Sequence, residues 1–301
     1  MPPSSANVDI RRVAVLGAGT MGSGIAQVCA QAGCDTRLFD AQSDALHRGM
    51  ARITDFWSKG IAKGKTTVEQ RAQWQSNLHL RDDLGAAVRD ADLVIEAVPE
   101  DMKLKQKVFG DVDQLAPPEA LLATNTSSLS VADIAKATHR PHRVLGMHFF
   151  NPVPLMPLLE LVRHNHTSPE ALAQAERFGK RLGKTTITVR DSPGFATSRL
   201  GIVLGNEAMR MLEEGVASAR DIDTAMRLGY GHPMGPLELS DLVGLDVRLG
   251  ISDYLNGKLG LDRYAAPPIV RKLVARGELG KKSGKGLYDW SDGTPREREL
   301  P

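Results

Sequence analysis

The sequence contains little of what points to a secreted, metal-binding or nucleic-acid-binding protein. Only two of its 301 residues are cysteines, Cys29 and Cys34, and no histidine stands near them in a metal-ligand spacing. We interpret both as small buried thiols in a protein of a reducing compartment. The formal net charge is only +2 at pH 7. This balance argues against nucleic acid or a membrane surface as the main partner and favours a small ligand.

Long apolar runs are also absent. Residues 1–10 contain no apolar segment of the kind that signal peptides need, and no stretch reaches the length that spans a bilayer. The last four residues, Arg-Glu-Leu-Pro, are not a peroxisomal address. From these absences we expect a cytoplasmic protein.

The composition is that of a soluble globular protein, with 42% hydrophobic and 25% charged residues. A chain of 301 residues exceeds the size at which a single hydrophobic core stops growing, so two domains are expected.

The first forty residues follow the order strand, glycine-rich turn, helix, strand and acid. Residues 12–16 are a short apolar, β-branched run, typical of a strand buried on both faces. In the turn that follows, Gly17 permits a tight bend and Gly19 lets the backbone approach a pyrophosphate. Gly22 lets the next helix lie close to the strand. The order therefore predicts a dinucleotide-binding turn.

The helix after this turn offers the amides of its first residues, Thr20 and Met21, to the phosphates of a dinucleotide. A second strand, residues 36–39, ends in Asp40, whose carboxylate is placed to accept hydrogen bonds from the adenosine ribose. Because that carboxylate would repel a 2′-phosphate, the pattern predicts NAD rather than NADP. The alternative, a purely structural glycine turn, leaves the rest of the arrangement unexplained.

A lysine cluster lies in residues 43–80, which are expected to be helical. Lys59, Lys63 and Lys65 surround two glycines there. One interpretation is the solvated surface of a helical hairpin. The other is a basic patch that meets the phosphates of a large substrate, and both stay open.

Three further apolar runs, residues 92–98, 120–124 and 143–148, predict buried strands. The second runs into Asn-Thr-Ser-Ser, residues 125–128, at the carboxyl end of a strand, where open α/β sheets bind ligands. These residues can also cap the following helix. Four consecutive polar residues exceed what one cap needs, so a functional cluster is favoured.

The third strand ends in His148, and a proline-rich segment separates it from Glu160. Prolines lack the amide donor and clash with the preceding helical turn, so a rigid loop is predicted. We interpret His148 as a general base and Glu160 as the carboxylate that stabilises its imidazolium and fixes its tautomer. The other histidines lack this setting. Surface positions in polar turns are expected for His139, His142, His164 and His166, and positions in the helical region for His47 and His79.

The second half is predicted to be helical after a last strand at residues 185–189. Apolar residues recur at helical spacing from Leu200 to Leu212, and Gly215 ends the run. We therefore expect an α/β, Rossmann-type, mostly parallel sheet with a helical hairpin insertion in residues 1–190, the NAD-binding domain. An all-α C-terminal domain, residues 191–301, is expected to supply the substrate cleft and the contacts of a homodimer.

Four motifs carry a resemblance to a known family: Asn125-Thr-Ser-Ser128, His148-Phe-Phe-Asn-Pro-Val-Pro154, Gly231-His-Pro-Met-Gly-Pro236 and Gly280-Lys-Lys-Ser-Gly-Lys-Gly286. Together with residues 12–40, they make the chain resemble the L-3-hydroxyacyl-CoA dehydrogenase family, and within it the short-chain 3-hydroxybutyryl-CoA dehydrogenases. The resemblance runs from about residue 11 to Trp290. It implies an oxidoreductase of fatty acid metabolism that uses NAD to interconvert (S)-3-hydroxyacyl-CoA and 3-oxoacyl-CoA.

By position, the resemblance implies that His148 is the general base and Glu160 the carboxylate that orients it. Ser127 and Asn151 match residues that hydrogen-bond the reacting oxygen and the nicotinamide end. After Pro193-Gly-Phe the family usually has an asparagine that completes the site, whereas this chain has Ser198. Serine also donates and accepts hydrogen bonds but reaches less far, so Ser198 departs from the family pattern at the expected substrate contact.

The resemblance also implies contacts with the cofactor and with coenzyme A. Glu100, Lys105 and Lys282 match cofactor contacts. Lys59 and Lys63 lie roughly where the family meets coenzyme A. No metal site is implied.

Two other classes share part of this pattern. A dehydrogenase of a free hydroxy acid or sugar acid, as in the gulonate dehydrogenase and lambda-crystallin relatives, would share the nucleotide turn, His148 and Glu160 but need no coenzyme A contacts. A non-catalytic, NAD-binding structural protein would have no use for the His148–Glu160 pair. A dehydrogenase of the 3-hydroxyisobutyrate type is disfavoured because residues 197–214 lack the lysine that those enzymes use.

Overall fold

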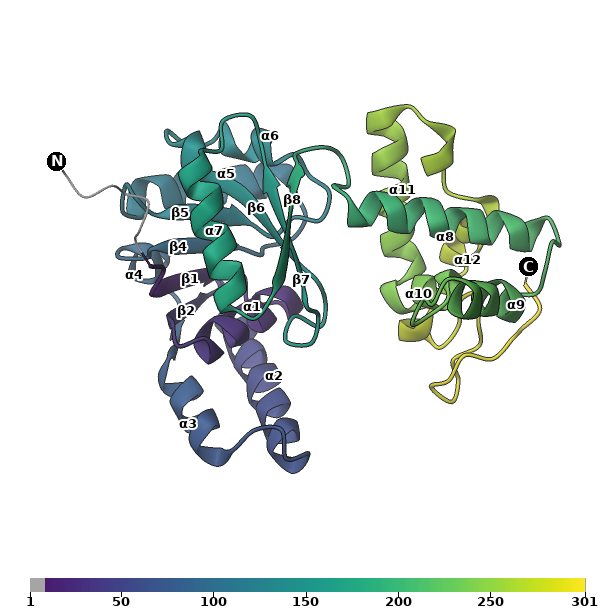
Figure 1. Ribbon diagram of the computed structural model, residues 1–301, viewed down its shortest axis with the longest axis horizontal. Coiled ribbons are helices and arrows are strands. Elements are labelled where there is room, and N and C mark those ends of the chain that lie inside the picture. The colour runs from purple at the N-terminus through teal and green to yellow at the C-terminus, as the bar shows by residue number, and fades with distance from the viewer. Residues whose placement is uncertain (1–8, 301) are drawn as a thin grey trace. The chain divides into compact units, whose positions relative to one another are not determined.

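The computed structural model describes residues 9–300, which divide into two compact units between Ser192 and Pro193. The first unit is a sheet flanked by helices, and the second is helical (Figure 1). No helix within residues 9–300 is both long and apolar enough to cross a membrane. The prediction on signal peptides concerns residues 1–10, of which residues 1–8 lie outside the described part.

An eight-stranded sheet forms the centre of the first unit, in the order β3-β2-β1-β4-β5-β6-β7-β8. Its strands are β1 Arg12–Leu16, β2 Asp35–Phe39, β3 Leu78–Arg81, β4 Leu93–Glu96, β5 Leu121–Thr124, β6 Val144–Phe149, β7 Leu158–Arg163 and β8 Thr185–Arg190. The first six in spatial order are parallel, whereas β7 is antiparallel to β6 and β8 is parallel to β7. The strand order reverses between β1 and β4. Open α/β sheets bind ligands outside the carboxyl ends of the two strands where the order reverses, so the ends of β1 and β4 are the expected place for a ligand. The predicted Rossmann-type, mostly parallel sheet is confirmed.

Helices cover both faces of this sheet. They are α1 Thr20–Gln31, α2 Ser43–Ala62, α3 Val68–Ser76, α4 Leu84–Val88, α5 Met102–Leu115, α6 Val131–Ala135 and α7 Pro169–Arg181, with a 3-10 turn at Pro141–Arg143. Helices α1 and α7 pack on one face through a single apolar cluster. Helix α5 covers the opposite face, where Phe109 and Val112 line a small cavity with Leu16 and Val94. The predicted helical hairpin is formed by α2 and α3.

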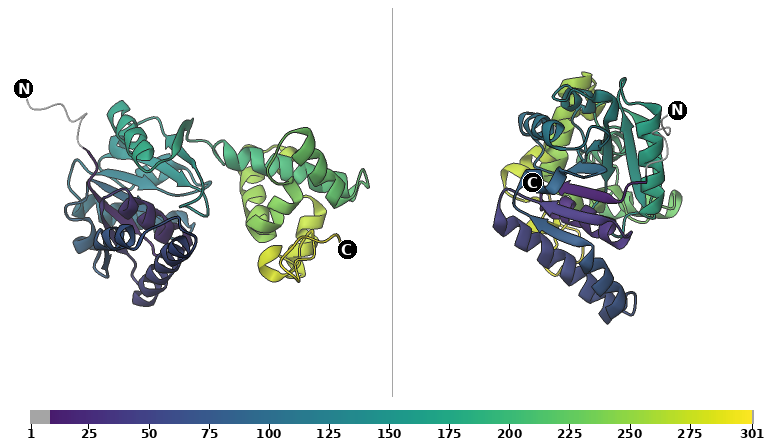
Figure 2. Two further views of the ribbon diagram at one scale, coloured as in Figure 1. Left: turned by 60° about the horizontal axis from the view of Figure 1, so that its bottom comes forward. Right: turned by 90° about the vertical axis from the view of Figure 1, so that its left-hand side faces the viewer.

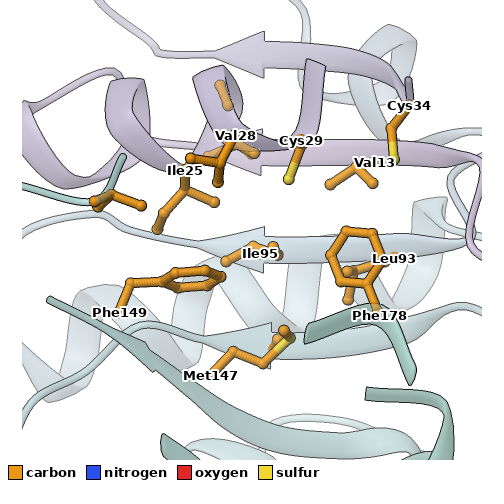
Figure 3. Close-up of a cluster of buried hydrophobic side chains, with 14 of the residues drawn as sticks. Val13, Ile25, Val28, Cys29, Cys34, Leu93, Ile95, Met147, Phe149 and Phe178 are labelled. Atoms are coloured by element: carbon orange, nitrogen blue, oxygen red, sulfur yellow. The ribbon is translucent and has the colours of Figure 1, made fainter. Parts of the chain in front are cut away.

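The apolar cluster explains why the strands are so rich in aliphatic residues. Val13, Leu93 and Ile95 project from their strands towards α1, and Phe178 of α7 closes the same cluster (Figure 3). Both cysteines are free thiols buried within it, as predicted. Burial raises the pKa of the Cys29 thiol.

Two strands differ from the sequence prediction. The sequence predicts helix throughout residues 43–80, which is wrong for the edge strand β3, so His79 lies in a strand. In a segment of only four residues, the alternation of apolar and polar side chains is too short to distinguish a strand from the end of a helix. The sequence also predicts a rigid loop as far as Glu160, but Glu160 lies within β7. The apolar run on both sides of it matches a strand buried on both faces.

The second unit has its own core. Its helices are α8 Thr197–Glu213, α9 Ala219–Thr224, α10 Pro236–Val243, α11 Leu245–Leu259 and α12 Pro268–Ala275, with a π turn at Ala225–Gly229 and 3-10 turns at Asp262–Tyr264 and Lys281–Ser283. They pack around Met209, Leu237, Leu273 and Trp290. Figure 2 shows the helices of this unit from two further directions. The predicted helical nature of this half is confirmed. Leu200, one of the apolar positions that predicted the first helix, is 72% exposed.

Candidate active site

The glycine-rich turn after β1 has a different steric demand at each glycine. Gly17 has φ of +98°, and a Cβ there would lie 2.6 Å from the carbonyl oxygen of Ala97. A Cβ at Gly22 would lie 1.7 Å from the carbonyl oxygen of Gly17. A Cβ at Gly19, by contrast, would meet nothing within 4 Å. Gly17 and Gly22 therefore close the turn, and Gly19 presents open backbone to a ligand.

Helix α1 begins immediately after this open position. Its N-cap is Gly19, which supplies no side-chain cap, and its first helical residues are Thr20 and Met21. The first amides of a helix have no intrahelical acceptor and carry a partial positive charge. An uncapped helix start beside an open glycine is therefore suited to the pyrophosphate of a dinucleotide.

Asp40 follows β2 at the same edge of the sheet. Its Oδ2 accepts a hydrogen bond from the amide of Ala18 at 2.8 Å, and its Oδ1 accepts one from the amide of Gln42 at 3.0 Å. These bonds fix the carboxylate against the glycine-rich turn. A carboxylate has further lone pairs with which to accept hydrogen bonds from ribose hydroxyls.

Below the carboxyl edge lies a buried ion pair between β4 and α5. The Nζ of Lys105 is 2.6 Å from Oε1 of Glu96, and each side chain is 1% exposed. The hydroxyl of Thr124 donates to the other Glu96 oxygen at 2.7 Å. Burial raises the pKa of Glu96, and the Lys105 ammonium opposes this rise. Lys105 also lies 3.3 Å from Oε2 of Glu100, which connects the buried pair to the surface.

Glu100 holds the polar cluster of residues 125–128. Its Oε1 accepts hydrogen bonds from the amide of Ser127 at 3.1 Å and from the hydroxyl of Thr126. The Glu100 side chain is 39% exposed, so it lies between the buried Lys105 and the surface. A ligand at this edge would therefore meet Glu100 before the ammonium of Lys105.

The same cluster ties β5 to the end of β6. The side-chain oxygen of Asn125 accepts a hydrogen bond from the amide of Phe149 at 2.9 Å. Helix α6 is capped by Ser130, whose hydroxyl accepts from the amide of Asp133. The cap thus lies outside residues 125–128, and the cluster instead fixes the strand end that carries His148.

His148 and Glu160 face each other across two antiparallel strands. They are direct partners in the register of β6 and β7, and Nδ1 of His148 lies 2.7 Å from Oε2 of Glu160. His148 is 7% exposed and Glu160 is fully buried. The aromatic ring of Phe150 packs against the imidazole, with a centroid distance of 4.4 Å. The sequence predicts the contact between His148 and Glu160, and the register of β6 with β7 brings the two side chains together.

This geometry favours one tautomer of His148. An ionised carboxylate accepts hydrogen bonds only, so an ionised Glu160 favours the proton on Nδ1. The lone pair of the neutral ring is then on Nε2. A histidine held in this way can take a proton at Nε2, and the adjacent carboxylate stabilises the resulting imidazolium.

A second buried histidine corrects the sequence prediction. His164 is predicted at the solvated surface but is only 3% exposed. Its Nε2 lies 3.1 Å from the carbonyl oxygens of both Pro141 and Val144. It follows β7 directly, and the 3-10 turn before β6 covers it. Burial lowers its pKa.

The other predicted contact residues of the first unit lie at its surface. Asn151 is exposed in the loop after β6. Lys59 lies in the last turn of α2 and forms an exposed ion pair with Asp55 at 2.7 Å. Lys63 and Lys65 follow in the exposed turn between α2 and α3.

Ser198 and Lys282 belong to the second unit. Ser198 lies in the first turn of α8. Lys282 lies in the 3-10 turn Lys281–Ser283, and its Nζ is 2.6 Å from Oδ1 of Asp246 in α11. Within residues 9–300, no group of three or more histidine, cysteine or acidic side chains is arranged to hold a metal ion.

Sequence reasoning missed Glu96 and Lys184. Glu96 ends an otherwise apolar strand, and an acid in such a position signals a buried partner because an unpaired buried charge is costly. Lys184 precedes β8 and is buried, with its Nζ on two backbone carbonyls. Its sequence neighbourhood gives no such signal.

Comparison with known proteins assigns both units to one family. Residues 12–192 match the family model of the 3-hydroxyacyl-CoA dehydrogenase NAD binding domain. Residues 194–290 match that of the 3-hydroxyacyl-CoA dehydrogenase C-terminal domain. The chain is 42% identical over 287 residues to a probable 3-hydroxybutyryl-CoA dehydrogenase of Bacillus subtilis, covering 95% of this chain and 100% of that one.

Two further comparisons extend over nearly the whole chain. A 3-hydroxybutyryl-CoA dehydrogenase of Mycobacterium tuberculosis is 42% identical, with coverage of 93% of this chain and 99% of that one. The crystal structure of (S)-3-hydroxybutyryl-CoA dehydrogenase from Ralstonia eutropha superposes with a TM-score of 0.89 at 40% identity. That match covers 93% of this chain and 99% of the solved one.

Proposed function

This chain belongs to the 3-hydroxyacyl-CoA dehydrogenase family, whose first domain binds NAD, and we propose that its substrate pair is (S)-3-hydroxybutyryl-CoA and acetoacetyl-CoA. The single observation that carries the proposed mechanism is the buried contact of 2.7 Å between His148 and Glu160. The names of the similar enzymes support the four-carbon acyl chain.

In the proposed mechanism, His148 is the general base. The residues of the nucleotide turn would hold NAD, which when bound would supply the redox chemistry by taking the hydrogen on the alcohol carbon as a hydride. The hydroxyl proton then has to leave, and Nε2 of His148 takes it. Glu160 stabilises the imidazolium because it lies against Nδ1 in a site from which most water is excluded. In the reverse direction His148 returns the proton to the oxygen.

We assign to Ser127 and Asn151 the hydrogen bonds to the reacting oxygen and to the nicotinamide end. Ser127 suits this role because Glu100 holds its backbone amide, so the hydroxyl is on a fixed loop. We also propose that Ser198 of the second domain contacts the substrate, with a shorter side chain than the asparagine usual in the family.

On the cofactor side, we propose that Gly17, Gly19, Thr20, Met21 and Gly22 surround the pyrophosphate. We assign Asp40 to the adenosine ribose. Glu100, Lys105 and Lys282 complete the proposed contacts, with Lys105 acting through Glu100 because its own ammonium is buried.

For coenzyme A, we propose the exposed surface at the end of α2, where Lys59 and Lys63 offer positive charge to phosphates. The second domain is proposed to supply the substrate cleft and to mediate a homodimer. Exposed apolar side chains on α10 and α11 support a covered surface there: Leu239, Leu242, Val243 and Val247. The free, buried cysteines support a cytoplasmic location.

The direct test is oxidation of NADH by the purified protein with a series of 3-oxoacyl-CoA substrates of increasing chain length. We expect saturable turnover with acetoacetyl-CoA and a lower kcat/KM with longer chains. Activity with free hydroxy or sugar acids but none with acetoacetyl-CoA would instead support the gulonate dehydrogenase-like alternative. Activity with neither class would support a non-catalytic NAD-binding protein.

The cofactor choice is tested in the same assay. Because we assign the Asp40 carboxylate to the ribose hydroxyls where NADP carries a phosphate, we expect a higher kcat/KM with NADH than with NADPH. A preference for NADPH would contradict the role assigned to Asp40.

A further inference from the structure

The loop between β6 and β7, residues 150–157, has more backbone acceptors than donors. Pro152, Pro154 and Pro157 are three of its eight residues, and none of the three has an N–H group. A backbone carbonyl that is buried without a hydrogen bond is costly, so donors from outside the loop are needed. This loop connects the strands of His148 and Glu160.

Only part of this need is met by the loop itself. The carbonyl oxygen of Pro152 accepts hydrogen bonds from the amides of Leu155 at 2.9 Å and Met156 at 3.0 Å. These bonds close one turn. The carbonyl oxygen of Pro157 accepts from the amide of Thr185 at 2.7 Å, which joins the end of the loop to β8.

Lys184 supplies two further donors. Its Nζ donates to the carbonyl oxygen of Val153 at 2.6 Å and to that of Met156 at 2.8 Å. The residue is 8% exposed, and among residues 9–300 no ion pair includes it. Burial lowers its pKa. An ammonium without a carboxylate partner is an expensive group to bury, so its two carbonyl contacts are the interactions that offset this cost.

The loop is also fixed on its other side by the nucleotide-binding helix. Val153 is 2% exposed, and a Cβ at Gly24 of α1 would lie only 2.9 Å from the Cβ of Val153. The loop therefore lies against α1 through Val153 and is held at two carbonyls by Lys184. Asn151 stands exposed two residues before Val153.

We propose that Lys184 is a positioning residue: its ammonium fixes the 150–157 loop so that Asn151 is presented to the substrate and the nicotinamide end. The contact assigned to Asn151 rests on the proposed function. The clamp, by which we mean the two hydrogen bonds from Lys184 to the carbonyls of Val153 and Met156, does not rest on it, because these contacts lie within the first unit.

The activity-independent test is hydrogen exchange of the Leu155 and Met156 amides. In Lys184→Met, which keeps an unbranched apolar stem but no donor, we expect faster exchange at both amides. The matched control is Lys180→Met, since Lys180 is exposed on α7. It is expected to exchange like the wild type. Unchanged exchange in Lys184→Met would overturn the clamp whatever the enzyme's substrate.

Lys184→Arg keeps the positive charge and the donors. We expect it to restore most of the amide protection, and it provides a test if Lys184→Met does not fold. An arginine variant whose loop amides exchange as fast as those of an open segment would also contradict the clamp.

The kinetic test separates positioning from general damage. We expect Lys184→Met to lower kcat by up to about 10²-fold, because small misplacements of a contact group have effects of this size. In an Asn151→Ala background the same substitution should cost much less, since the contact that it positions is already missing. Fully additive losses would refute the link to Asn151. A protected loop in a wild type that is inactive with every 3-oxoacyl-CoA would refute the proposed function but leave the clamp intact.

Discussion

The two ends of the β6–β7 strand pair each hold a buried histidine, and the two differ in their partners. At one end, His148 lies 2.7 Å from the carboxylate of Glu160. At the other, His164 lies 3.1 Å from two backbone carbonyl oxygens. Both are less than one-tenth exposed. Burial alone therefore does not distinguish the histidine proposed to be catalytic from the other one.

The partner makes the distinction. An ionised carboxylate beside Nδ1 of His148 would stabilise a positive charge on the ring, which the proposed role as a general base requires. Neutral carbonyls accept the Nε2 proton of His164 without a formal charge to balance an imidazolium. Burial therefore lowers the pKa of His164. Four predictions follow this contrast, in order of decreasing effect.

The largest effect is expected for His148→Ala. Turnover should fall by roughly 10³- to 10⁴-fold, because the general base is lost while the nucleotide turn is untouched. Steady-state NADH oxidation with acetoacetyl-CoA measures the loss, and NADH fluorescence titration should show near-normal cofactor binding. Near-normal turnover in this variant would remove His148 from the mechanism.

A smaller loss is expected for Glu160→Gln. The amide cannot stabilise an imidazolium, and its NH₂ group favours the tautomer with the proton on Nε2, so kcat should fall on the order of 10²-fold or more. Circular dichroism should confirm that the variant is folded. A kcat equal to that of the wild type would show that the contact between the two side chains has no catalytic role.

His164→Ala is expected to lower stability instead of activity. Removing the ring leaves the carbonyl oxygens of Pro141 and Val144 without this donor, which should cost about 1–3 kcal/mol of unfolding free energy. Urea denaturation measures the change in unfolding free energy. The kcat per folded molecule should stay within about twofold of the wild-type value, because His164 lies at the opposite end of the β6–β7 pair from His148. A large fall in kcat with an unchanged unfolding free energy would contradict the structural role of His164.

The smallest effect concerns pH. The pKa of His164 is lowered in the folded chain, whereas the pKa of a histidine in an unfolded chain is about 6.5. Between these two values the unfolded chain binds a proton that the folded chain does not. The unfolding free energy therefore rises with pH across this window, and acidification through it destabilises the protein. Urea denaturation at a series of pH values should show a weaker dependence in His164→Gln. An identical dependence in both proteins would mean that His164 is not the group involved.

The sequence predicts the nucleotide-binding half well because each part of it has a local signal. The glycines at 17, 19 and 22, the apolar strands and Asp40 each reflect a constraint that one residue satisfies on its own. The same is true of His148 at the end of a strand. The general architecture of sheet followed by helices also comes from such local patterns.

What could not be predicted depends on contacts between distant residues. The placement of Glu160 opposite His148 follows from the register of β6 with β7, which no local pattern specifies. His164 is buried because a turn some twenty residues earlier supplies its acceptors. The buried ammonium of Lys184 likewise becomes understandable only once the carbonyls of Val153 and Met156 are seen beside it.

The most direct test of this account is the tautomer of each histidine, observed by nitrogen-15 NMR of the imidazole rings above neutral pH. We predict that His148 carries its proton on Nδ1, which leaves the lone pair on Nε2, and that His164 carries its proton on Nε2. A His148 ring with its proton on Nε2 would contradict its assignment as a base oriented by Glu160.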